Sequence, residues 1–160
     1  MDTTRMRTWA EIDLTALEHN YRTLRAMLPR ECRFLGLCKA NAYGHGAAVI
    51  GHTLERLGAD MLAVACVSEA EELRQSGVKL PILCLGETPE ELIPLLLELD
   101  VTQMVEDLET GRRLSAAAQR AGRTLRVHVK LDTGMSRLGF LWEACLLYTS
   151  PSPRDVEESR

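Results

Sequence analysis

One lysine of this chain stands where a positive charge is unfavourable unless it is used. Lys39 follows an apolar stretch, residues 34–38, whose composition predicts a buried strand, and it begins the glycine-rich turn K-A-N-A-Y-G-H-G. A buried ammonium group is costly unless its amine is neutralised or bonded to another group. Lysine amines in enzymes are used in this way when they form Schiff bases with carbonyl compounds. Lys39 is therefore the first candidate for chemistry.

A second group of polar residues alternates along a later strand. His128 and Lys130 fall on one face of the strand predicted over residues 125–131, Asp132 continues the same alternation just past its end, and apolar side chains fall on the other face. In a barrel the three polar side chains would line the interior, although a structural hydrogen-bonding role for His128 stays open. Arg137 follows in a loop between two glycines, where its planar cation suits a carboxylate or a phenolate oxygen.

Strands and helices alternate along the chain and must position these residues. Apolar residues at helical spacing predict a helix over residues 13–27 with Asp13 as its N-cap. The apolar run 61–67 precedes a helix that we expect Ser68 to cap, with Glu69 in its first turn, where the helix dipole favours acids. The other predicted elements are strands over 34–38, 81–85, 102–105 and 125–131, and helices over 47–57, 89–99 and 107–121.

This alternation predicts an α/β protein with a parallel sheet, which is either open or closed into a barrel. No Gly-x-Gly-x-x-Gly turn follows the first strand, so a dinucleotide-binding open sheet would lack its phosphate cradle. Polar residues at strand ends favour a (β/α)₈ barrel instead, although a complete barrel has eight strands and about 250 residues. We therefore predict the N-terminal portion of a barrel of this type, about five βα units, incomplete.

Composition excludes several classes of protein. The chain has 160 residues, of which 46% are hydrophobic and 26% are charged, as in soluble globular proteins. A net charge of −4 without a basic run argues against a nucleic-acid partner. We expect a cytoplasmic protein, because no signal peptide and no membrane span are apparent. Spacing predicts neither a zinc site nor a disulfide framework for the cysteines, at positions 32, 38, 66, 84 and 145.

Residues 39–46 and 130–139 together closely resemble the motifs of alanine racemases. That family uses pyridoxal 5'-phosphate and has an N-terminal (β/α)₈ barrel, a C-terminal β domain and an active site shared by a homodimer. The resemblance covers roughly residues 6–144, and two long motifs in the right order are more specific than one short pattern. It implies a cofactor-dependent interconversion of L-alanine and D-alanine, which supplies D-alanine for peptidoglycan.

The resemblance also implies roles for four residues. The family lysine that matches Lys39 carries the cofactor covalently and acts as one of two bases. The tyrosine that matches Tyr43 contacts the cofactor phosphate, and the arginine that matches Arg137 lies by the phenolic oxygen and helps to bind the substrate carboxylate. The lysine that matches Lys130 is often carbamylated. Without the motifs, Tyr43 would be read as a packed aromatic residue and Arg137 as a solvated cation.

The part of the chain that resembles the family is shorter than a whole alanine racemase. We expect residues 1–144 to be a partial N-terminal barrel and 145–160 to be a non-family tail, artefactual or disordered, with the C-terminal β domain absent. The family's second base, a tyrosine of the other subunit's C-terminal domain, would then be missing and the fragment inactive alone. A pyridoxal-phosphate carrier without racemase turnover and a non-functional fragment are the alternatives. The choice between alanine, serine and other small amino acids stays open.

Overall fold

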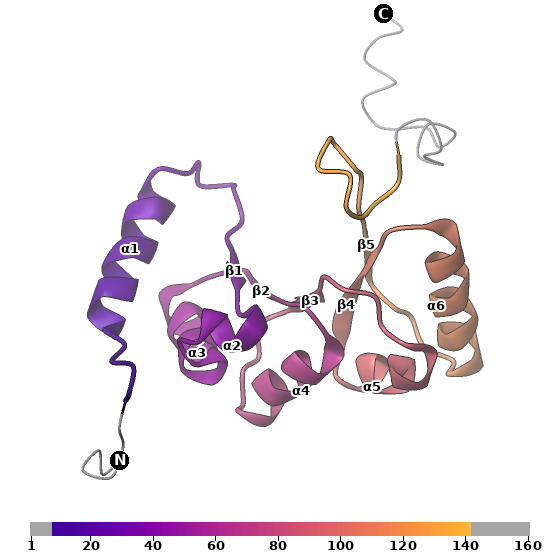
Figure 1. Ribbon diagram of the computed structural model, residues 1–160, viewed down its shortest axis with the longest axis horizontal. Coiled ribbons are helices and arrows are strands. Elements are labelled where there is room, and N and C mark those ends of the chain that lie inside the picture. Colours follow the sequence, from indigo (N-terminus) through magenta and orange to yellow (C-terminus); the bar gives the residue numbers. More distant parts are fainter. Residues whose placement is uncertain (1–7, 142–160) are drawn as a thin grey trace, which may run out of the picture.

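The computed structural model describes residues 8–141, which form one parallel β-sheet flanked by helices (Figure 1). The strands are hydrogen-bonded in the order in which they occur in the chain, as expected when each crossover helix leads to the next strand. The predicted succession of five parallel strands is confirmed: β1 (Leu35–Leu37), β2 (Met61–Val64), β3 (Ile82–Cys84), β4 (Val101–Val105) and β5 (Val127–Val129).

Helices connect the strands and lie along one side of the sheet in Figure 1. The helices predicted over residues 13–27, 47–57 and 107–121 are confirmed to within a residue at each end, and the one predicted over 89–99 begins with a 3₁₀ turn. A short helical segment at residues 39–43 lies where only a turn was predicted. Within the described residues, no helix combines the length and the apolar character that a bilayer crossing needs. The helical segments are α1 (Leu14–Ala26), α2 (Lys39–Tyr43), α3 (Ala47–Leu57), α4 (Val67–Gln75), η2 (Glu90–Leu92), α5 (Ile93–Glu98) and α6 (Leu108–Arg120).

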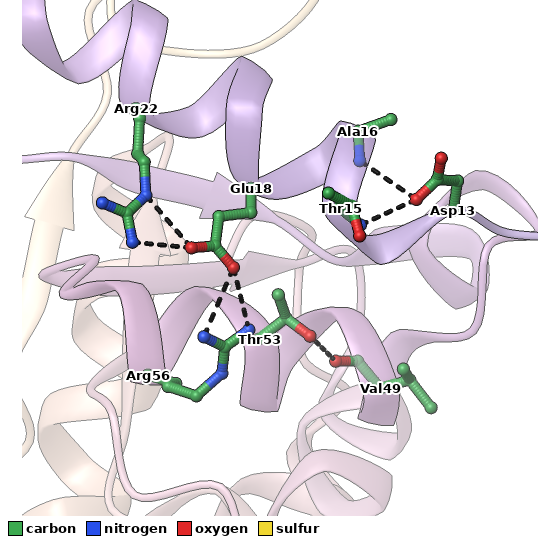
Figure 2. Close-up of polar contacts among 8 residues, drawn as sticks. All are labelled: Asp13, Thr15, Ala16, Glu18, Arg22, Val49, Thr53 and Arg56. Carbon is green, nitrogen blue, oxygen red and sulfur yellow. Dashed lines mark hydrogen bonds and ion pairs between the residues drawn. The ribbon is translucent and has the colours of Figure 1, made fainter.

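The first helix packs against the third near the start of the sheet. Asp13 caps α1 as predicted, because its carboxylate accepts hydrogen bonds from two amides of the first turn at 2.8 and 3.1 Å. Glu18 of α1 accepts hydrogen bonds from Arg22 one turn later, at 2.6 Å, and from Arg56 of α3, at 3.4 Å (Figure 2). Only the pair with Arg56 joins the two helices, and exposed ion pairs of this kind add little to stability.

Two apolar clusters lie on opposite faces of the sheet. The larger one fills the space between strands and helices and contains the fully buried Leu62, Leu73 and Leu96. The smaller one, formed by Ala63, Leu83 and Met104, lies on the other face. Alternation along the strands explains the division, because neighbouring residues of a strand point to opposite faces. The second face also carries the candidate site.

The strand before Lys39 differs from its prediction. Residues 34–38 were expected to form a buried strand, but β1 is an edge strand with an alternating pattern of exposure. Leu35 and Leu37 are 38% and 43% exposed, whereas Gly36 and Cys38 are buried. Among the described residues β1 pairs only with β2, so its other edge has no strand partner. An apolar run alone could not distinguish an edge strand from a central one.

The predicted cap of the fourth helix is also wrong. The helix begins at Val67 with Cys66 in the N-cap position, so Ser68 lies inside the first turn. No side chain at the N-cap position bonds to the helix amides. Glu69 instead reaches back to the amide of Ala65 at 2.7 Å. The Glu69 carboxylate thus bonds to the residue before the N-cap, and the N-cap side chain makes no capping bond to the first turn.

Candidate active site

Three cationic side chains from distant parts of the chain meet at the carboxyl ends of the strands. Lys39, Lys130 and Arg137 border one cavity of about 360 Å³, a volume within the range of small-molecule sites. Lys39 follows β1 and Lys130 follows β5, so the sheet brings together residues that are far apart in the sequence. The remaining lining is mostly apolar and consists of Ala65, Leu85, Gly86, Met104 and Leu138.

Lys39 opens a segment of left-handed backbone. Residues 40–43 all have φ values between 52° and 54°, and none of them is a glycine. Left-handed helical backbone costs L-residues about 1–2 kcal/mol each, so surrounding contacts must hold the turn. One such contact is the 2.7 Å hydrogen bond from the Ala47 amide to the Asn41 side chain, and Gly44 ends the turn with φ 87°. The sequence predicts a turn here but not its left-handed backbone.

Tyr43 lies on this turn but outside the cavity. Its side chain is 60% exposed, and the Lys39 Nζ atom lies 5.9 Å from the centre of its ring. This distance is at the limit of a cation–π contact. The two residues are therefore neighbours, and the phosphate contact expected of Tyr43 stays a prediction.

The loop that carries Arg137 is closed onto the end of β5. The Lys130 amide donates to the Val105 carbonyl at 2.8 Å, which extends the strand pairing. Further along, the Phe140 amide donates to the Lys130 carbonyl and the Asp132 amide donates to the Phe140 carbonyl, both at 2.9 Å. The chain thus returns to Lys130 at Phe140, and this closed loop brings Arg137 to the cavity that Lys130 also borders.

Asp132 organises the inside of this loop. Its carboxylate accepts hydrogen bonds from the amides of Gly134, at 3.0 Å, and Ser136, at 2.9 Å. These bonds favour the ionised form and lower the pKa of the Asp132 carboxyl below its usual value. Asp132 is therefore a support of the loop, since it is not among the residues that border the cavity.

His128 shares a sheet face with the site but does not reach it. His128 pairs in register with Met104, so both side chains project from the face opposite the helices, as the alternation predicted. The His128 side chain is exposed and does not border the cavity. Of the three polar residues expected inside a barrel, only Lys130 lines this cavity.

A buried hydrogen-bond network around one glutamine fixes another wall of the cavity. The sequence patterns did not predict this network. Gln103 of β4 is fully buried, and its Nε2 donates to the carbonyls of Gly86 and Met104 at 2.8 Å. Its Oε1 accepts from the Thr88 hydroxyl at 2.6 Å. These bonds hold the segment after β3 that borders the cavity. A glutamine within an apolar strand was the signal, because a buried amide must find partners.

The electrostatic character of the cavity is positive. Within the part of the chain that the structure describes, the residues that border this cavity include three cationic side chains and no carboxylate. Like charges in a site of low dielectric constant repel one another, so an anionic ligand or a negative modification would stabilise the arrangement. The site combines a lysine amine with groups that suit anionic oxygen atoms.

The chain has clear relatives among characterised sequences and structures. The profile of the family "Alanine racemase, N-terminal domain" matches residues 12–148. The alanine racemase of Methanococcus maripaludis is 41% identical over 149 residues, covering 93% of this chain and 40% of that protein. That of Desulfovibrio desulfuricans is 42% identical over 142 residues, covering 89% of this chain and 38% of the relative.

Solved structures show the same relationship. The structure of a Clostridium difficile alanine racemase in complex with cycloserine aligns with a TM-score of 0.82 and 39% identity, covering 96% of this chain and 40% of that one. The chain thus spans about 40% of the length of these relatives, and the shared part is the N-terminal portion of their barrel. The profile match, the sequence identities and the aligned fold agree that the chain belongs to the alanine racemase family.

Proposed function

We propose that this chain provides the pyridoxal-phosphate-binding part of an alanine racemase and that Lys39 bonds to the cofactor. The observation that carries the proposal is the meeting of Lys39, Lys130 and Arg137 around one cavity in a member of this family. Both motifs that led to the family resemblance reach this cavity: residues 39–46 contribute Lys39, and residues 130–139 contribute Lys130, Arg137 and Leu138.

The residues present fit the cofactor. Its aldehyde requires a primary amine, and Lys39 supplies one at the wall of the cavity. Its phenolic oxygen and phosphate are anionic, and the other two charged groups that border the cavity are cations. The apolar remainder of the lining suits a flat aromatic ring. When bound, pyridoxal phosphate stabilises negative charge at Cα of an amino acid.

The side chains of this chain then have separate tasks. The Lys39 amine, once displaced by the substrate amine, removes or returns the Cα proton on one face. Arg137 binds anionic oxygen, that of the cofactor ring and that of the substrate carboxylate. We assign the phosphate contact to Tyr43. Carbamylation of Lys130 would replace a repulsion between Lys130 and Arg137 by an attraction.

We extend the proposal to alanine as the substrate, to a homodimer and to the cytoplasm. Support for alanine comes from the relatives, which are named alanine racemases. Inversion at Cα needs a second proton-transfer group on the opposite face, and we assign it to the partner subunit. The chain alone would then bind the cofactor without completing the inversion.

Titration with pyridoxal phosphate tests the proposal. We expect a visible absorbance band on binding, and we expect Lys39→Ala to abolish it. Lys79→Ala is the matched control, because Lys79 is an exposed lysine outside the cavity. Equal binding by wild type and Lys39→Ala would show that Lys39 is not the anchor.

A carrier protein without turnover is the second candidate function. Both candidates bind the cofactor, so the distinction needs the substrate. With Lys39 as a base, the chain should exchange the Cα proton of one alanine enantiomer in deuterated water. A carrier would bind the cofactor and leave this proton in place.

A further inference from the structure

We infer that Glu69 is a positioning residue for Lys39, because its carboxylate ties the turn that carries Lys39 to the end of the neighbouring strand. This inference rests on the proposed function, in which Lys39 is the reactive amine. Glu69 lies in the first turn of α4 and does not border the cavity, so it acts through the backbone of other residues.

The two oxygens of the carboxylate serve two different connections of the sheet. Oε1 accepts the Ala40 amide at 2.6 Å, and Oε2 accepts the Ala65 amide at 2.7 Å. Ala40 follows Lys39 directly, whereas Ala65 follows β2 and borders the cavity. Hydrogen bonds to an ionised carboxylate are short and strong, so Glu69 joins the carboxyl ends of β1 and β2.

We call the hydrogen bond from the Ala40 amide to the Glu69 carboxylate the tether. Its position matters because the turn after Lys39 has strained backbone. Ala40 is the first of the consecutive left-handed residues, so its amide marks the point at which the chain leaves ordinary backbone geometry. A right-handed turn at this place would send the chain in another direction and reorient the Lys39 side chain. The bond from Ala40 to Glu69 therefore acts where the direction of the turn is decided.

The tether continues across the sheet to the opposite wall of the cavity. The Ala65 carbonyl accepts the Gly86 amide at 3.0 Å, so the Ala65 backbone is held through both its amide and its carbonyl. The Gly86 carbonyl in turn accepts from Gln103 of β4. A line of hydrogen bonds thus runs from the residue after Lys39 to the fourth strand, and Glu69 is its only side-chain link to the lysine turn among these bonds.

The simpler interpretation is that Glu69 only supports the local connection between β2 and α4. That role requires the bond to Ala65, four residues earlier, and does not require the bond to Ala40, twenty-nine residues away. The two roles can be separated by shortening the side chain. We expect Glu69→Asp to keep the charge and the local bond but to lose the bond to Ala40.

The experiment compares Glu69→Gln and Glu69→Asp with two controls in the 160-residue chain. Glu72→Gln removes a charge from an exposed position of the same helix. Asp107→Ala removes the cap of α6, where the carboxylate accepts the Thr110 amide at 2.7 Å. The first control matches the loss of charge, and the second matches the loss of a local carboxylate bond at the start of a helix far from Lys39.

Two readouts are measured on each variant. The first is hydrogen exchange of the Ala40 and Ala65 amides, which does not depend on the cofactor. The second is the ratio of Lys39 to Lys79 modification by pyridoxal phosphate and borohydride, read by peptide mapping. Both Glu69 variants should speed Ala40 exchange roughly tenfold to a hundredfold, as expected for a lost hydrogen bond to a charged group, and should lower the ratio similarly.

Unchanged Ala40 exchange in both Glu69 variants would overturn the tether. An unchanged labelling ratio, or an equal fall of the ratio in Asp107→Ala, would reduce Glu69 to a local support of the start of α4 and overturn its positioning role. If wild type is labelled on Lys79 in preference to Lys39, the proposed function fails. The exchange of Ala40 still decides the tether in that case.

Discussion

Substitution of Gly139 by alanine should displace the loop that carries Arg137. Gly139 has a φ of 113°, a conformation that L-residues rarely adopt, and a Cβ there would lie 2.9 Å from the Lys130 carbonyl oxygen and 3.0 Å from the Asp132 nitrogen. The backbone conformation costs about 1–3 kcal/mol for alanine. Steric crowding against the backbone adds about 1–3 kcal/mol more.

Gly134 offers a matched control in the same loop. Its φ is 126°, so Gly134→Ala has a similar conformational cost, but no atom lies within 4 Å of the Cβ position. The difference between the two variants therefore measures the crowding alone. At tenfold per 1.4 kcal/mol, the difference of about 1–3 kcal/mol corresponds to roughly one to two powers of ten in the opening equilibrium.

Hydrogen exchange of the Phe140 amide is the assay, because this amide donates to the Lys130 carbonyl where the loop closes. Gly139→Ala should accelerate exchange of the Phe140 amide more than Gly134→Ala does, by roughly one to two powers of ten. The amide of Leu62, which donates to the Pro81 carbonyl within the sheet, should be unchanged in both variants. Equal acceleration in the two variants would refute the steric argument and leave only backbone strain.

Three other predictions concern stability. Leu73→Ala should lower the free energy of unfolding by about 2–5 kcal/mol in urea titrations, because the Leu73 side chain is fully buried between sheet and helices, and a loss below 1 kcal/mol would contradict this packing. Burial, and secondarily the charge of Glu69, raises the pKa of the Cys38 thiol to about 11. The Cys38 thiol ionises at a lower pH in the unfolded chain than in the folded one. Its contribution to the free energy of unfolding is therefore complete below about pH 9 and is lost as the pH rises toward 11. A Cys38→Ala variant should lack this part of the alkaline decline in the free energy of unfolding, and an identical decline would count against it. The pKa of Asp132 is lowered, whereas that of Cys38 is raised, so the pH dependence runs the other way. The support that Asp132 gives to the loop holds above about pH 4 and is lost as the pH falls through the folded pKa. The amide shifts of Gly134 and Ser136 should follow this titration, and Asp132→Asn should remove it.

Local signals in the sequence predicted most elements of the fold. The capping acid Asp13 and the terminal glycine Gly58 mark helix ends through bonds and backbone angles that depend on few neighbours. The edge position of β1 could not be predicted in this way, because it depends on which strands pair with it. The Ser68 cap was wrong because the helix begins one residue before it, at Val67. The bond from Ala40 to Glu69 joins distant parts of the chain, and no local pattern reveals it.

The candidate site shows the same difference between residues that the sequence predicts and residues that act through distant contacts. Lys39, Lys130 and Arg137 were named from their positions in the sequence, and the structure brings all three to one cavity. The supports of the site were not identified. Residues 40–43 include no glycine, so nothing in their sequence indicates a left-handed turn. Gln103 and Glu69 act through hydrogen bonds to distant backbone. Such contacts follow from the packed sheet and not from the spacing of residues.

Covalent mapping of the cofactor tests the central claim most directly. The sequence contains lysines only at positions 39, 79 and 130, so reduction of the pyridoxal-phosphate complex with borohydride followed by mass spectrometry can distinguish every lysine. We predict one phosphopyridoxyl group, on Lys39. A group on Lys130 or Lys79, or labelling spread evenly over the three, would contradict the assignment of Lys39 as the residue that holds the cofactor.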